Sequence, residues 1–177
     1  MSLEEKLAKA GIKKILVVDD KMENLGAAKE YFESLERYGI KTDYASSAEQ
    51  AKEKIQQAYK DKEKYSVIIS DLVMEEPDSG LQVIREGFKH QTYGFIATGR
   101  NHGHHGPFTY ILPVDYNVNG GKEKPEVWQK VFEKVLEHLA EEAKPVIAAL
   151  ERYYKHVGMP SDSLADTAIR MYESMLK

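Results

Sequence analysis

Short apolar runs alternate with amphipathic stretches along most of the chain. Five runs rich in β-branched and aromatic residues predict buried strands at 14–18, 40–45, 65–70, 94–98 and 109–114. Between the earlier runs, apolar residues recur at spacings of three and four, which predicts helices. The expected buried faces are Leu25, Ala28, Phe32 and Leu35 in the first helix, Ala48, Ala51, Ile55 and Ala58 in the second, and a short third helix at 80–88.

Polar residues at the edges of these stretches predict where the helices begin and end. Asn24 is a candidate N-cap for the first helix, and Gly39 is a candidate stop signal. Ser46, followed by Glu49, has the spacing of a capping box at the start of the second helix. Strands and helices that alternate through short connections predict an α/β fold with a doubly wound five-stranded parallel sheet.

The chain from residue 126 onward has a helical pattern. One apolar stripe, which is typical of the last helix of a sheet domain, consists of Trp128, Val131, Val135 and Leu139. We therefore expect a domain over residues 1–141 and a C-terminal helical hairpin over 142–177. The hairpin either covers apolar surface of its own domain or forms an arm for homodimerisation or partner binding.

Composition narrows the classes of function. Hydrophobic residues make up 42% and charged residues 31% of the chain, which is typical of a soluble globular protein. A net charge of −4 disfavours nucleic-acid binding, and no apolar run approaches the roughly 20 residues of a membrane span. The absence of cysteine excludes disulfides and thiolate metal sites, and we expect a cytoplasmic location.

Acidic residues follow two of the predicted strands. Asp19 and Asp20 come after the first strand and Asp71 after the third, while Thr98 ends the fourth. Because sites in parallel sheets lie at the carboxyl ends of the strands, we expect these side chains to converge. Converging carboxylates attract a cation such as Mg²⁺, and one of them could act as a nucleophile toward phosphorus.

The same segments resemble a known family. KKILVVDDKMEN, SDLVMEEPDSGLQVIRE and GFIAT are similar to motifs of the receiver domain of two-component response regulators, over roughly residues 12–140. The resemblance implies a receiver-like, flavodoxin-like sheet. It also implies that Asp71 is the phosphoacceptor and that Mg²⁺ is bound by Asp19, Asp20, Asp71 and the backbone carbonyl of Val73, with Thr98 as the switch hydroxyl.

The family also implies partners. A histidine kinase or a phosphotransfer protein would donate the phosphoryl group, and an unknown protein effector would receive the signal. Such a domain is not a turnover enzyme. It catalyses at most its own phosphorylation and dephosphorylation.

Two features of the family pattern are missing from the sequence. Receivers carry a lysine at the end of the fifth strand, where this chain has Leu112, Pro113 or Val114. A charge-assisted hydrogen bond is worth about 1.5–3 kcal/mol, so its loss is expected to weaken the phosphorylated state. The segment GRNHGHHGPF after Thr98 is too rich in glycine and proline for the family's fourth helix.

The same segment supplies candidate auxiliary residues. Arg100 could replace the missing lysine, and His102, His104 and His105 could bind a transition metal or assist at a phosphoryl group. A purely structural loop is the alternative for the histidines.

Three hypotheses about function remain from the sequence. The first is an atypical phosphorylatable receiver, and the second is a pseudo-receiver that binds partners with weak or no phosphotransfer. The third is a phosphatase of the haloacid-dehalogenase type. Those enzymes need a second Asp two residues after the nucleophile, where this chain has Val73.

Overall fold

A computed structural model describes residues 1–77, 79–98, 111–113 and 121–141, together with Arg152, Lys155, His156 and Gly158. The predicted hairpin at 142–177, with its role in dimerisation, lies outside the described residues except for those four. The same holds for the reduced fourth helix expected between Thr98 and the fifth strand.

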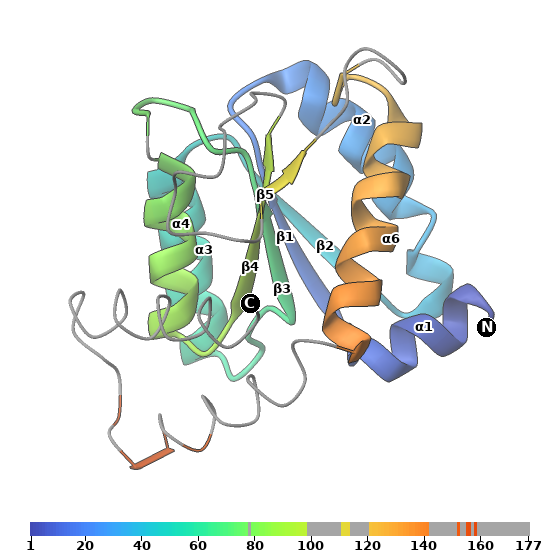
Figure 1. Cartoon of the computed structure of the whole chain (residues 1–177). Coiled ribbons are helices and arrows are strands. Elements are labelled where there is room, and N and C mark those ends of the chain that lie inside the picture. The colour runs from blue at the N-terminus through green and yellow to red at the C-terminus, as the bar shows by residue number, and fades with distance from the viewer. Residues whose placement is uncertain are drawn as a thin grey trace.

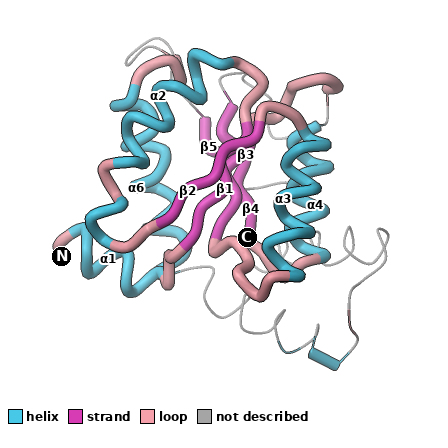
Figure 2. Tube along the Cα trace, turned by 180° about the vertical axis from the view of Figure 1, so that it is seen from behind, coloured by secondary structure: helices cyan, strands magenta, loops and turns pink. Residues whose placement is uncertain are grey.

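Parallel strands form one central sheet (Figure 2). Its order is β2-β1-β3-β4-β5, and every neighbouring pair is parallel. The strands are β1 (Lys14–Val18), β2 (Lys41–Ala45), β3 (Val67–Ser70), β4 (Tyr93–Thr98) and β5 (Ile111–Pro113). The predicted α/β class and parallel sheet are confirmed.

Helices cover both faces of the sheet (Figure 1). One layer consists of α1 (Leu3–Ala10), α2 (Met22–Glu33) and α6 (Pro125–Glu141). The other consists of α3 (Ala48–Lys60) and α4 (Ser79–Lys89). Because β1 connects to β2 on one side and β3 lies on the other, strand order reverses between β1 and β3, where ligands bind in such sheets.

The buried core follows the apolar pattern of the sequence. Ile15 to Val18 in β1 are fully buried, as expected for a strand covered on both faces. Every residue of the three predicted apolar stripes is buried, including Phe32 in α2, Ile55 in α3 and Trp128 in α6. No helix in the described part of the chain is long and apolar enough to cross a membrane.

Two of the predicted helix caps are wrong, that of α2 by three residues and that of α3 by one. Asn24 lies inside α2, whose N-cap is Lys21, and its side chain bonds to Asp19 instead of a backbone amide. The cap of α3 is Ser47, which accepts from the Gln50 N–H. The Gln50 side chain accepts from the backbone N–H of Ser46, the residue before the cap.

Gly39 ends a short 3₁₀ helix, Glu36–Tyr38, that follows α2. Its φ of +76° is the left-handed conformation that glycine adopts without strain. The predicted stop at Gly39 is therefore wrong for α2, which ends at Glu33 with Ser34 as its cap, and Gly39 instead ends the 3₁₀ helix before β2.

Candidate functional site

The register of the sheet brings two acidic residues together. Val18 of β1 pairs with Ser70 of β3, so Asp19 and Asp71 follow on neighbouring strands at the same edge. The Asp71 N–H donates to the Val18 carbonyl at 2.8 Å, and the Asp19 N–H donates to the Ala45 carbonyl at 3.1 Å. The backbone therefore continues the ladder up to both carboxylates and fixes where they begin.

Asp20 completes an acidic cluster with these two residues. Asp19, Asp20 and Asp71 each offer a carboxylate oxygen, and these atoms lie within 4.8 Å of one another. Asp19 is fully buried, Asp71 is half-buried, and Asp20 is exposed. The predicted convergence of these three carboxylates is therefore present, with one open side toward solvent.

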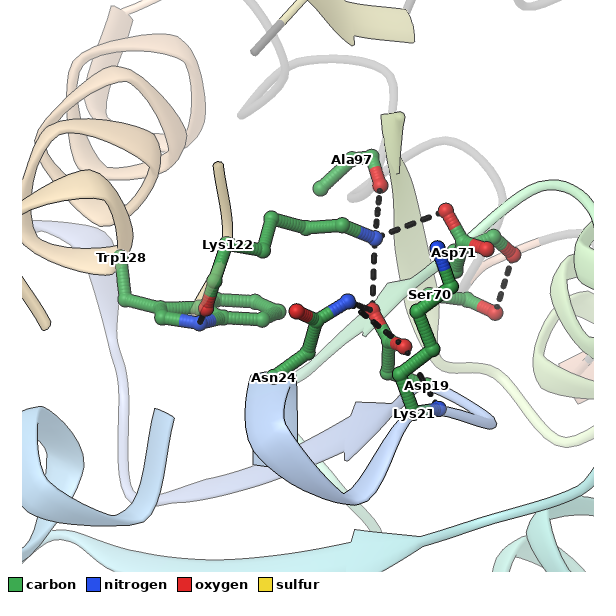
Figure 3. A network of polar contacts seen from close by, with 8 residues as sticks. All are labelled: Asp19, Lys21, Asn24, Ser70, Asp71, Ala97, Lys122 and Trp128. Carbon is green, nitrogen blue, oxygen red and sulfur yellow. Dashed lines mark hydrogen bonds and ion pairs between the residues drawn. The ribbon is translucent and has the colours of Figure 1, made fainter. Parts of the chain in front are cut away.

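A lysine bridges two members of this cluster, Asp19 and Asp71 (Figure 3). The Lys122 Nζ donates to Asp19 Oδ2 at 2.6 Å, to Asp71 Oδ1 at 2.7 Å and to the Ala97 carbonyl at 2.9 Å. The side chain of Lys122 is only 2% exposed. All three donor positions of the ammonium group are occupied, as an ammonium buried this deeply requires.

The expectation that the acidic pocket lacks a lysine is wrong. β5 itself carries none, but the chain returns to the pocket at Lys122, just before α6 begins at Pro125. Sequence comparison with the end of the fifth strand missed this residue because its place is set by the start of α6. Gly120 and Gly121 directly before it are the only local signal.

Asp19 is held from the α2 side as well. The Asn24 amide donates to Asp19 Oδ1 at 3.0 Å and to Oδ2 at 3.1 Å, and the Lys21 N–H donates to Oδ1 at 3.0 Å. With Lys122, these donors satisfy both oxygens of a fully buried carboxylate (Figure 3). Asn24 was missed as a site residue because it resembled a helix cap.

The pocket shifts the pKa values of its charged groups. Burial raises the pKa of the Asp71 carboxyl; Lys122 lowers it and the negative charge of Asp19 raises it, so that the pKa stays above its usual value. Burial by itself lowers the pKa of the Lys122 amine, but Asp19 and Asp71 outweigh burial and raise it. Lys122 is therefore a cation at neutral pH.

The backbone after Asp71 is packed tightly against the start of α4. The Gly80 N–H donates to the Leu72 carbonyl at 2.9 Å, and a Cβ at Gly80 would collide with the Asp71 carbonyl and lie 2.8 Å from the Leu72 Cα. The Ser70 hydroxyl donates to the same Asp71 carbonyl at 2.9 Å. Only glycine fits this approach.

The other predicted site residues are placed as follows. Thr98, at the end of β4, is buried, and Val73 is half-buried in the loop that follows Asp71. Glu75 in that loop accepts from the Ala48 N–H at 2.7 Å and so caps α3. The four auxiliary candidates, Arg100, His102, His104 and His105, lie outside the described residues.

Comparison with known proteins gives no family for the chain. No protein-family model matches it, and a search of curated proteins finds no match. Among solved structures, a fusion protein containing a trimeric coiled coil of yeast Spc42 is similar at 19% identity, over 82% of this chain and 92% of that chain, with a TM-score of 0.46. A likeness this weak supports no conclusion about function. The functional argument therefore rests on the geometry of the site.

Proposed function

We propose that this chain is a receiver-like signalling domain in which Asp71 accepts a phosphoryl group. The observation that carries the proposal is the contact of the Lys122 Nζ with both Asp19 and Asp71, at 2.6 and 2.7 Å. A buried cation beside a carboxylate could neutralise the charge of a phosphoryl group transferred to that carboxylate.

The strand order supports the flavodoxin-like, receiver-like assignment. In sheets of order β2-β1-β3-β4-β5, ligands bind at the switch point between β1 and β3. Asp19 and Asp71 follow these two strands. Thr98 lies one strand farther, where the family resemblance would place the switch hydroxyl.

The acidic cluster fits Mg²⁺. Three carboxylates with one exposed member match a cation that takes a few protein oxygens and keeps several waters. Asp19, Asp20 and Asp71 would hold the ion, with the Val73 carbonyl as a further ligand by the family resemblance. When bound, Mg²⁺ supplies positive charge that stabilises the transferred phosphoryl group.

Asp71, Lys122 and Asn24 have separate roles in the proposed reaction. A carboxylate oxygen of Asp71 attacks the phosphorus of a phosphohistidine, and the bond from phosphorus to the donor nitrogen breaks. Lys122 turns from Asp71 toward the new phosphoryl oxygens while Asn24 keeps Asp19 in place. Hydrolysis of the aspartyl phosphate by water returns free phosphate and the Asp71 carboxylate.

This reaction implies the partners of a signalling domain. The donor is a histidine kinase or phosphotransfer protein, and the output is a contact with a protein effector. A net charge of −4 does not favour nucleic acid as that partner. The cytoplasm is the compartment in which such donors phosphorylate their receivers.

A pseudo-receiver is the second candidate, and Lys122 itself favours it. The ammonium group already pairs with Asp19 and Asp71, so the pocket is neutralised in part without any metal. In that case the fold binds partners while phosphotransfer is weak or absent.

Incubation with acetyl phosphate and Mg²⁺, followed by mass spectrometry, separates the two candidates. We expect one phosphoryl group on Asp71, lost in Asp71→Asn and kept in the control Asp61→Asn at the end of α3. A beryllofluoride adduct with the same dependence on Asp71 is expected. If the wild-type chain forms neither adduct, the phosphoacceptor proposal is wrong and the pseudo-receiver remains.

A further inference from the structure

Lys122 reaches the acidic pocket from a segment outside the sheet. A residue on a strand is held by the hydrogen bonds of the ladder, but β5 ends at Pro113, well before Lys122. The backbone of Lys122 therefore needs another anchor. That anchor is the indole of Trp128, whose Nε1–H donates to the Lys122 carbonyl at 2.7 Å (Figure 3).

We propose that Trp128 is the positioning residue that holds Lys122 in the acidic pocket. This inference rests on the proposed function, because it assigns the support of the cation that the phosphoryl group would meet. Trp128 contacts Lys122 in two ways. Besides the hydrogen bond, its ring centroid lies 5.9 Å from the Lys122 Nζ, within the range of a cation–π contact.

Trp128 is suited to this role because it cannot move freely. The side chain is fully buried in α6 and packs edge-on against Phe32 of α2, with ring centroids 6.2 Å apart. Phe132, one turn along α6, packs against the same Phe32 at 5.3 Å. A buried indole also needs a partner for its N–H, and the Lys122 carbonyl is that partner.

The two helices of this layer hold opposite members of one ion pair. On α2, Asn24 fixes Asp19, while on α6, Trp128 fixes Lys122. Phe32 and Trp128 join the two helices next to the pocket. The packing of α2 against α6 therefore sets how closely the Lys122 ammonium approaches Asp19.

The test removes the indole N–H and little else. Because Trp128 is the only tryptophan in the chain, global replacement of tryptophan by 3-benzothienylalanine changes this one position and substitutes sulfur for the N–H. Two properties are measured in the full chain. One is the rate at which an amine-reactive ester labels Lys122, and the other is the beryllofluoride concentration needed to half-saturate Asp71 with Mg²⁺ present.

A matched control separates positioning from loss of packing. Phe132→Leu shrinks the same aromatic cluster without touching Lys122. We expect the benzothienylalanine protein to label faster at Lys122 and to need more beryllofluoride, each by about threefold to tenfold, the range for one buried hydrogen bond. Phe132→Leu is expected to change both by less than twofold at temperatures where it stays folded.

The positioning role of Trp128 and the phosphoacceptor proposal would be overturned by different outcomes. Wild-type labelling and saturation in the benzothienylalanine protein would overturn the positioning role and leave the phosphoacceptor proposal standing. Equal changes in the Phe132→Leu control would also overturn it, since packing alone would explain them. If the wild-type chain forms no adduct, the phosphoacceptor proposal fails, and the labelling of Lys122 still decides whether Trp128 holds it.

Discussion

The ammonium group of Lys122 lies 2.7 Å from a carboxylate oxygen of Asp71, although 51 residues separate them in the chain. The same ammonium group lies 2.6 Å from Asp19. Two acids that would repel each other at one edge of the sheet thus share a buried cation. The ion pairs connect the ends of β1 and β3 to the start of α6.

Replacing Lys122 by methionine should destabilise the fold and make it dependent on Mg²⁺. The change leaves Asp19 and Asp71 without their cation, and removing one partner of a buried pair costs about 3–5 kcal/mol. We expect Lys122→Met to unfold at a much lower urea concentration than the wild type. Millimolar Mg²⁺ should raise this urea midpoint part of the way back to the wild-type value. Lys124→Met, at an exposed neighbouring position, should unfold like the wild type.

Asp20 should separate metal binding from stability. Its side chain is exposed, so Asp20→Asn should change the free energy of unfolding without Mg²⁺ by less than about 0.5 kcal/mol. Binding of Mg²⁺ to the folded state alone stabilises it by RT ln(1 + [Mg²⁺]/Kd), and this increment should fall in Asp20→Asn. Thermal unfolding with and without Mg²⁺ measures it, with Glu23→Gln on α2 as the charge-matched control. An unchanged increment would remove Asp20 from the metal site.

Strand positions and the acidic cluster could be predicted because both follow from local pattern and general topology. The run at 14–18 forms β1 with the predicted bounds, and a parallel sheet with this register must bring Asp19 and Asp71 together. The alternation of apolar runs and helical patterns was enough to predict which sheet edge carries the two carboxylates. This prediction required no knowledge of contacts between particular side chains.

Lys122 and Asn24 could not be predicted in the same way. The position of Lys122 depends on a hydrogen bond to Trp128 and on the packing of α6 against α2, and no short-range period encodes either. Asparagine is common at helix N-caps, which is why Asn24 was predicted as one. However, α2 begins at Met22, and the Asn24 side-chain amide donates to Asp19 instead. In both cases the side chain donates to a buried carboxylate that must be satisfied, and this contact depends on tertiary structure rather than on local sequence.

Tyr65 should make the stability of the chain fall at alkaline pH. Its buried hydroxyl donates to Asp43 Oδ2 at 2.6 Å, and burial followed by this hydrogen bond raises the pKa of Tyr65 far above its usual value. A raised pKa in the folded state gives stability that is complete below pH about 10, where unfolded tyrosine begins to ionise, and is lost as the pH rises.

The comparison of Tyr65→Phe with the wild type tests this sign. Near pH 8 the variant should be less stable by about 1 kcal/mol, because Asp43 is partly exposed and keeps Lys14 at 3.6 Å. Phenylalanine does not ionise, so the difference should narrow as the pH rises above 10. Urea unfolding across this range measures it, with Tyr38→Phe as the control. A difference that widens with pH would contradict the prediction.

Gly80 should be essential to the geometry of Asp71, unlike a second glycine on the other helical layer. A Cβ at Gly80 would collide with the Asp71 carbonyl, which is backbone and cannot turn away as a side chain could. Gly80→Ala should therefore displace the end of β3, cost about 1–3 kcal/mol as for other overpacked sites, and reduce adduct formation at Asp71.

At Gly26 in α2, an added Cβ meets nothing within 4 Å. Gly26→Ala should stabilise the chain by about 0.5–1 kcal/mol through helix propensity and leave the adduct unchanged. Urea midpoints and beryllofluoride saturation, measured on both variants, check the pair. Similar behaviour of the two alanine variants would show that the close approach at Gly80 does not constrain Asp71.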